Sequence, residues 1–157
     1  MRLEYFQLID RIVDLNLADR KISSEATVPT ASTIFEGHFP SYPLMPGVLL
    51  IEAMAQTSGW LVVALNRFAR MPFLAAVKEA KLRTFVTPGQ KLTINAHLAH
   101  DGSGYAITEA KIKCGGKPIC DATLTLRVLD FPSAELGQRM REIADRIGLQ
   151  VEARANG

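Results

Sequence analysis

The chain has few cysteines and almost no net charge, and each shortage excludes a class of protein. Only two of its 157 residues are cysteines, Cys114 and Cys120. Two thiols do not make a disulfide framework or a metal-binding signature, so we expect free thiols and no bound metal. The formal net charge is +2, which does not support nucleic-acid binding but is compatible with a local basic patch that docks an acidic partner.

Targeting and membrane signals are also scarce. Glu4 and Asp10 interrupt the apolar start of the chain, which is not the pattern of a signal peptide, and we expect a cytoplasmic protein. One apolar run, residues 44–65, has the length of a bilayer span. Glu52 lies inside this run, and an acid near the middle of a span costs roughly 3 kcal/mol on insertion. We therefore predict a core helix and no membrane span.

The second half of the chain is rich in strict alternation between apolar and polar residues. Residues 92–98 place apolar side chains on one face and polar ones on the other, which is typical of a half-buried strand. Residues 105–114 and 122–128 read in the same way, after turn signals at 101–104 and 115–116. These three segments predict an antiparallel meander with one wet face.

Earlier in the chain we predict three further strands and one long helix. The strands are expected at residues 5–15, at 20–30 and over most of 71–86. The helix is expected from about residue 46 to 65, where Pro46 suits a first turn. Because this helix is apolar nearly all round, it must be covered on most sides. A curved sheet wrapped around it is the simplest arrangement.

The C-terminal segment predicts a separate amphipathic helix, with Ser133 as its N-cap and Gly148 at its end. Its apolar stripe consists of Leu136, Met140, Ile143 and Ile147. The predicted fold class is therefore α+β, with one long apolar central helix wrapped by a curved antiparallel sheet of about six strands, plus the extra C-terminal helix. Residues 1–130 are assigned to the main domain, and residues 131–157 to a helix and tail of the same domain.

The stretch EGHFPSYPLMPGVLLIEAMAQ, residues 36–56, holds the side chains best placed for chemistry. His38 lies in a loop stiffened by three prolines, as a positioned catalytic group requires, although an ordinary solvated histidine fits the same loop. Glu52 follows inside the apolar helix, with Gln56 one turn further on. A carboxyl group in apolar surroundings tends to keep its proton and can act as an acid. A glutamate at a wet edge of the sheet would instead be a surface residue.

The start of the predicted helix adds a site for negative charge. The first backbone N–H groups of a helix, here those of Gly47 and Val48, have no acceptor inside the helix and favour an anion. A base, an acid and an oxyanion donor, namely His38, Glu52 and the Gly47 amide, suit proton abstraction next to a carbonyl group with loss or gain of water at the β carbon. The spacing alone does not establish that these groups meet.

The segment GHFPSYPLMPGVLLIEAMAQ closely resembles the signature of the 3-hydroxyacyl-[acyl-carrier-protein] dehydratases of the FabZ type, which have the hot-dog fold. FQLIDRIVDL and AKLRTFVTPGQKL resemble further segments of that family, so the resemblance covers most of residues 4–129. It implies that His38 takes the C2 proton of the substrate and that Glu52 acts on the departing 3-hydroxyl group. It also implies that the Gly47 amide binds the thioester carbonyl and that Gln56 orients the acid.

The resemblance also implies an assembly and a path for the substrate. In the family, the His and Glu of one site come from different subunits, so we expect a homodimer with shared active sites, which can assemble further as a trimer of dimers. The residues expected to bind substrate are Gly47, Val48, Gln56, Phe39, Leu82 and Phe85. Leu82 and Phe85 replace the usual Phe and Pro of the family, and Ser41 replaces its usual Gly. The changes at Leu82 and Phe85 suggest a different chain-length preference, whereas Ser41 only shapes the loop. Together with the extra C-terminal helix, the set suggests a specialised paralogue.

The leading prediction is an enzyme acting on carrier-bound acyl chains. Acyl carrier protein is acidic, and Lys78, Lys81 and Arg83 are the residues expected to dock it. The expected reaction is the reversible dehydration of (3R)-3-hydroxyacyl-[acyl-carrier-protein] to trans-2-enoyl-[acyl-carrier-protein] in fatty acid or lipid biosynthesis, with no metal or cofactor. The alternatives are a non-catalytic acyl-binding hot-dog protein and an acyl thioesterase on the same fold.

Overall fold

A computed structural model describes residues 1–151 of the chain. Six strands form one antiparallel sheet in the order β1-β2-β4-β5-β6-β3, so β1 and β3 are its edges. The strands are β1 (Arg11–Asn16), β2 (Lys21–Thr27), β3 (Met71–Leu82), β4 (Lys91–Asp101), β5 (Tyr105–Cys114) and β6 (Lys117–Leu129). The helices are the 3-10 turn η1 (Leu3–Tyr5), α1 (Thr33–Gly37), α2 (Gly47–Leu65) and α3 (Ala134–Ile147).

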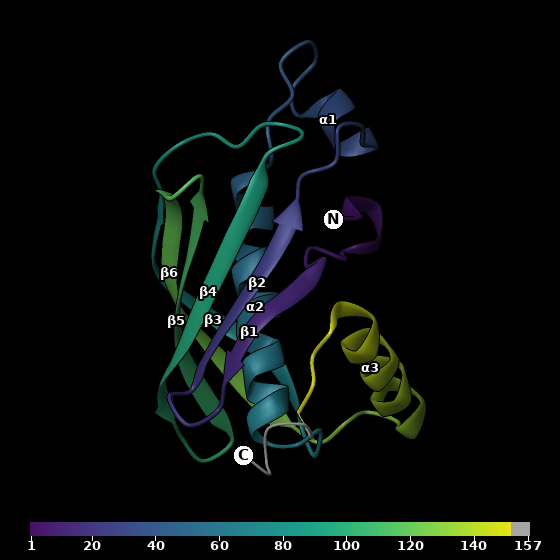
Figure 1. Cartoon of the computed structure of the whole chain (residues 1–157), viewed down its shortest axis with the longest axis vertical. Helices are drawn as coiled ribbons and strands as arrows, with labels where there is room; N and C mark the ends of the chain where they lie inside the picture. Colours follow the sequence, from purple (N-terminus) through teal and green to yellow (C-terminus); the bar gives the residue numbers. More distant parts are fainter. Residues whose placement is uncertain (152–157) are drawn as a thin grey trace.

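Helix α2 is the centre of the fold, and the curved sheet wraps around one side of it (Figure 1). Its interior positions are almost all apolar, and Ala53, Met54 and Leu61 are completely buried. Within the described residues, α2 is the one helix long and apolar enough to cross a membrane, and 67% of its most apolar stretch is buried inside the protein. The apolar run is therefore the core helix that the sequence predicts, and the hot-dog fold is confirmed.

The meander of β4, β5 and β6 is also confirmed, with the predicted face turned toward the core. Leu92, Ile94, Ala96 and Leu98 are at most 4% exposed. The turn between β5 and β6 holds Gly115 and Gly116 at φ values of 56° and 78°. Two consecutive residues with positive φ are what a tight two-residue hairpin requires, and glycine adopts them without steric cost.

Two pairs of buried hydroxyl groups attach α2 to the sheet. The Ser24 and Thr57 hydroxyls lie 2.7 Å apart, and the Thr108 hydroxyl donates to the Ser58 oxygen over 2.8 Å. All four side chains are fully buried. Because a buried hydroxyl without a partner costs about 1–3 kcal/mol, these pairs favour one register of the helix on the sheet.

Both cysteines are free, as predicted. Burial in β6 raises the pKa of the Cys120 thiol to about 11.

The predicted first strand at residues 5–15 is wrong in its first half. Residues 3–5 form η1, Phe6 has a φ of 53°, and the strand begins only at Arg11. The reason is tertiary, because the Gln56 side chain bonds the Phe6 carbonyl and the Leu8 amide. These backbone groups therefore bond to α2 rather than to a neighbouring strand.

The segment that leads to His38 is not all loop. It contains the short helix α1, whose first turn is capped by the Ser32 hydroxyl, which accepts from the Ile34 amide.

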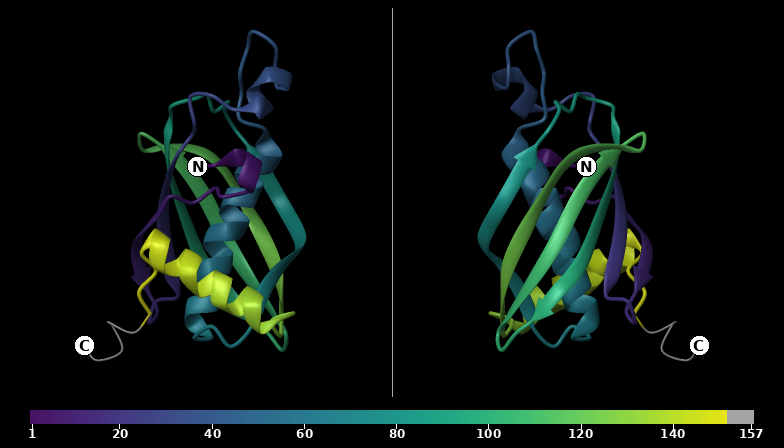
Figure 2. Two further views of the ribbon diagram at one scale, coloured as in Figure 1. Left: turned by 90° about the vertical axis from the view of Figure 1, so that its right-hand side faces the viewer. Right: turned by 90° about the vertical axis from the view of Figure 1, so that its left-hand side faces the viewer.

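Helix α3 lies across α2 on the side that faces away from the sheet (Figure 2). The Ser133 hydroxyl accepts a hydrogen bond from the Leu136 amide, and Gly148 closes the helix at a φ of 81°, as predicted. Ile147 is buried, and Met140 and Ile143 pack against the core while remaining partly exposed. The rest of the predicted tail, residues 152–157, lies outside the described residues.

Candidate active site

The backbone of its own loop holds His38 at the end of α1. The His38 amide donates to the Ile34 carbonyl over 3.0 Å, and the Leu44 amide donates to the His38 carbonyl over 2.9 Å. The His38 Nδ1 lies 2.9 Å from the Leu44 carbonyl oxygen. Because a carbonyl oxygen only accepts, Nδ1 carries the hydrogen in this contact, and Nε2 of the neutral ring is then free to accept a proton. The half-buried imidazole also stacks on Phe39, with 4.0 Å between ring centroids.

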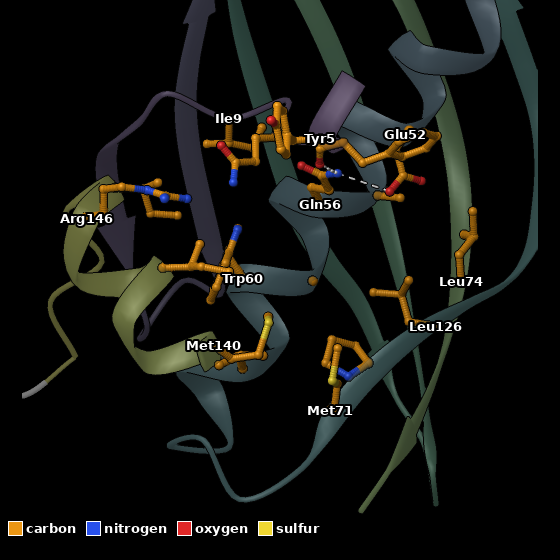
Figure 3. Close-up of a pocket in the computed structure, with 18 residues that line it drawn as sticks. Tyr5, Ile9, Glu52, Gln56, Trp60, Met71, Leu74, Leu126, Met140 and Arg146 are labelled. Carbon is orange, nitrogen blue, oxygen red and sulfur yellow. Dashed lines mark hydrogen bonds between the residues drawn. The ribbon is translucent and has the colours of Figure 1, made fainter. Parts of the chain in front are cut away.

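The Gln56 side chain holds the Glu52 carboxyl in place. Its Nε2 donates to Glu52 Oε1 over 3.1 Å and to the Phe6 carbonyl over 2.7 Å, while its Oε1 accepts from the Leu8 amide over 3.1 Å. Figure 3 shows the contact between the two side chains as a dashed line. Glu52 and Gln56 are both half-buried. The turn-spaced pair therefore meets as the sequence predicts, and the N-terminal segment fixes its orientation.

Glu52 and His38 line different cavities within one chain. His38, Gly47, Leu82 and Phe85 lie around a cleft of about 620 Å³, called here the His38 cleft. Glu52 and Gln56 line a second cavity of about 330 Å³, called here the Glu52 pocket. No hydrogen bond joins His38 to Glu52 within residues 1–151. A single chain therefore presents the candidate base, His38, and the candidate acid, Glu52, at two separate places.

The N-terminus of α2 opens into the His38 cleft. No acceptor in residues 1–151 binds the Gly47 amide, as expected for the first N–H group of a helix. A Cβ atom at position 47 would collide with the Leu82 Cδ1 atom, so glycine allows the Leu82 side chain to lie over this helix end. Val48 does not line the cleft, and its side chain is 71% exposed.

Of the other residues predicted to bind substrate, Phe39, Leu82 and Phe85 all line the His38 cleft. Their side chains are 48%, 50% and 70% exposed, respectively. Apolar side chains of this size, left open to solvent around one cleft, are typical of a surface that a ligand or a partner covers. Gln56 does not belong to this group, because it lies in the Glu52 pocket.

The three predicted docking cations differ in their surroundings. Lys78 and Lys81 are exposed on β3, and neither has an ion-pair partner within the described part of the chain. Arg83 is ion-paired with Asp121. Lys81 and Arg83 line a groove of about 990 Å³ along the sheet that also receives three lysines not singled out from the sequence, Lys21, Lys111 and Lys113. Lys21 lies on β2, and Lys111 and Lys113 lie on β5. Both strands pair with β4, so only the pairing register reveals that Lys21 is near the other two.

The Glu52 pocket also contains residues that the sequence did not indicate as part of a site. Tyr5, Phe6 and Ile9 reach it from the N-terminal segment, and Met140 and Ile143 reach it from α3. Met140 and Ile143 belong to the apolar stripe of the predicted helix, but such a stripe is equally typical of ordinary core packing.

Within residues 1–151, no group of three His, Cys, Asp or Glu side chains is arranged to hold a metal ion.

The fold places the protein in the hot-dog class, because a six-stranded antiparallel sheet wraps a long helix. A histidine loop precedes this helix, and a glutamate lies in its second turn. A family profile described as the FabA-like domain matches residues 2–123. A 3-hydroxyacyl-[acyl-carrier-protein] dehydratase FabZ of Lactococcus lactis subsp. cremoris is 36% identical over 121 residues, which cover 76% of this chain and 83% of that protein. The chain therefore belongs to the FabZ-like dehydratases of the FabA-like domain family.

Solved structures of similar shape show the fold alone, because their sequences are distant. The dehydratase heterocomplex ApeI:P of Xenorhabdus doucetiae matches with a TM-score of 0.64 and 18% identity, covering 86% of this chain and 90% of that one. A hypothetical thioesterase protein with coenzyme A from Streptococcus pneumoniae matches with a TM-score of 0.61 and 19% identity, covering 78% and 88%. Dehydratases and proteins named thioesterases thus share this architecture, and only the site can separate the two activities.

Proposed function

We propose that the protein is a 3-hydroxyacyl-[acyl-carrier-protein] dehydratase that reversibly converts a (3R)-3-hydroxyacyl thioester into the trans-2-enoyl thioester. The observation that carries the proposal is that hydrogen bonds fix the orientation of both candidate side chains, His38 and Glu52. The Leu44 carbonyl fixes His38 with Nε2 free, and the Gln56 amide fixes the Glu52 carboxyl. Because the relatives are named 3-hydroxyacyl-[acyl-carrier-protein] dehydratases, carrier-bound 3-hydroxyacyl chains are the substrate class to test.

The proposed chemistry needs only these side chains and the start of α2. Nε2 of His38 removes the C2 proton while the C3–O bond breaks, and protonated Glu52 gives its proton to the departing hydroxyl group. The C2=C3 double bond forms and water leaves. The Gly47 amide stabilises the negative charge that develops on the thioester oxygen. Return of the C2 proton from His38 to Glu52 restores both groups, so the reaction balances without a cofactor.

The two cavities become one site if two chains share them, and β3 supports such a dimer. It is a 12-residue edge strand whose other side has no partner strand within residues 1–151. Phe73, Leu74 and Val77 on this strand are 37–42% exposed. A long exposed apolar edge is a template for pairing with another chain. We propose a homodimer in which His38 of one chain works with Glu52 of the other.

A mixed-dimer experiment tests the reaction and the sharing together. His38→Ala and Glu52→Gln should each lower kcat for enoyl thioester formation, followed by absorbance, by roughly 100- to 10,000-fold. A heterodimer of the two variants would contain one site with both native groups, so activity should return when they are co-expressed. Near-native turnover in either single variant would contradict the mechanism, and a silent heterodimer would contradict the shared site. Release of free thiol in place of enoyl thioester would indicate a thioesterase.

A further inference from the structure

Helix α3 lies outside the part of the chain that the family profile matches, yet it forms a wall of the Glu52 pocket. The match ends at residue 123, and α3 covers Ala134–Ile147. Met140, Ile143 and Arg146 nevertheless line the same cavity as Glu52. A structural element added beyond the matched region therefore shapes the surroundings of the proposed catalytic acid.

The pocket has a polar end and an apolar end. Figure 3 shows Glu52 and Gln56 at one end and Met71 and Met140 at the other. Along α2, the pocket reaches from Glu52 to Trp60 and beyond; these two are eight residues apart, or about 12 Å at 1.5 Å per residue. The lining past the polar end is mainly apolar, with Ala55, Trp60, Val63, Pro72, Leu74 and Leu126, and Arg146 adds a cation from α3. A volume of about 330 Å³ is at the lower end of the range for small-molecule sites.

We propose that α3 determines which acyl chain lengths the protein accepts, because the acyl chain lies along α2 beyond Glu52 and packs against Met140 and Ile143. This inference rests on the proposed function. If Glu52 acts on the 3-hydroxyl group, the rest of the acyl chain extends from this point into the apolar part of the pocket. The occupant that fits the apolar side chains beyond Glu52 is therefore the alkyl chain of the substrate.

Met140 is the position where a change tests this wall most directly. It packs against the core but is only partly buried, unlike Trp60, which is 6% exposed. Its side chain is unbranched and can shift to fit chains of different shape. The matched control is Gln138 on the same helix, which is exposed and does not line the pocket, and whose side-chain amide donates to Glu142.

The kinetic test uses a ladder of carrier-bound substrates from 3-hydroxybutyryl to 3-hydroxyhexadecanoyl. Met140→Trp fills the far end of the pocket and should lower kcat/KM for the longer chains by about 10-fold or more relative to kcat/KM for 3-hydroxybutyryl. Met140→Ala should shift acceptance toward longer or bulkier chains. Gln138→Trp should leave kcat/KM unchanged for every substrate in this series. Thermal melts of each variant establish that it is folded, and Met140→Ala carries the test if Met140→Trp does not fold.

A second readout does not depend on turnover. Trp60 is the single tryptophan of the chain and lines the pocket, so its emission should change when a long saturated acyl-pantetheine binds and stay constant with butyryl-pantetheine. Met140→Ala should alter the acyl length at which the change begins. The role of α3 would be overturned if kcat/KM depended on acyl length in the same way in the wild type and both Met140 variants. It would also be overturned if no acyl chain changed the Trp60 emission. Absence of all dehydratase activity would overturn the proposed function alone, because the Trp60 titration would still decide whether an acyl chain enters the pocket.

Discussion

Gln56 connects the candidate acid to the backbone of the N-terminal segment. Its amide donates to Glu52 and to the Phe6 carbonyl, and its oxygen accepts from the Leu8 amide. A glutamine used in this way restricts the rotation of the neighbouring carboxyl group. It also satisfies two backbone groups that have no strand partner at this point in the chain.

Replacing Gln56 with alanine should therefore affect both stability and turnover. Two backbone groups would lose their partner, at a cost of about 1–3 kcal/mol in the free energy of unfolding. Because the carboxyl group is no longer held, kcat should fall roughly 10- to 100-fold with little change in KM. Gln90→Ala is the control, since that side chain accepts from the Thr87 amide in a remote turn. Unchanged kcat in Gln56→Ala would show that Gln56 does not position the acid.

At the scale of elements, α1 is a single short helix that positions His38, and a carboxylate from elsewhere holds its start. Oε1 of Glu4 accepts from the Ser32 hydroxyl over 2.6 Å, from the Thr33 amide over 3.0 Å and from the Thr33 hydroxyl over 3.2 Å. The hydrogen bond from Ser32, followed by backbone hydrogen bonding, lowers the pKa of Glu4 from its ordinary value of 4.5. The η1 turn and α1 are thereby linked through the ionised form of Glu4.

The sign of the resulting pH dependence follows from the lowered pKa. A carboxyl group with a lowered pKa in the folded state contributes its full stability above the ordinary value of 4.5, and this contribution is lost as pH falls through the folded-state pKa. The Tm of the wild type should therefore exceed that of Glu4→Gln at neutral pH, and the difference should shrink on acidification below 4.5. Glu36→Gln, an exposed change within α1 itself, is the control. A Tm difference that does not vary with pH would contradict this account.

At the scale of the whole molecule, the two edges of the sheet allow a matched test of the proposed dimer. Val77 on edge strand β3 and Val13 on edge strand β1 are each 40% exposed. A charge on an edge strand opposes pairing with another chain. Val77→Lys should therefore yield monomers in sedimentation velocity and lose dehydratase activity, whereas Val13→Lys should remain dimeric and active. A dimeric, active Val77→Lys would exclude β3 as the interface.

Carrier docking is also a property of the whole surface. Lys78 and Lys81 are exposed cations without an ion-pair partner in residues 1–151, so they are available to an acidic protein. The double charge reversal Lys78→Glu and Lys81→Glu should raise KM for carrier-bound substrate about 10-fold, because like charges then meet at the interface. KM for the same acyl chain on pantetheine should not change. The control is Arg20→Glu, an exposed position in the turn between β1 and β2 near the opposite edge of the sheet. Equal effects on both substrates would indicate damage to the site instead of lost docking.

Local sequence patterns were sufficient wherever neighbours in the chain decide the structure. The apolar run of α2, the alternation of β4 and the caps at Ser133 and Gly148 were all predicted and confirmed. The first strand was predicted too long, because the pairing of residues 6–8 depends on Gln56, far away in the chain. The short helix α1 was missed for a related reason, since Glu4 and Ser32 together stabilise a single turn of weak intrinsic preference.

The sequence by itself determined the family, the hot-dog fold and the candidate pair His38 and Glu52, because these depend on residue types at fixed spacing along one segment. Only the tertiary structure decided that the two side chains line separate cavities and that Gln56 holds the acid. It alone placed α3 against the Glu52 pocket. The physical reason is that an apolar stripe on a helix specifies burial but not the surface that buries it, and that surface comes from the packing of the whole chain.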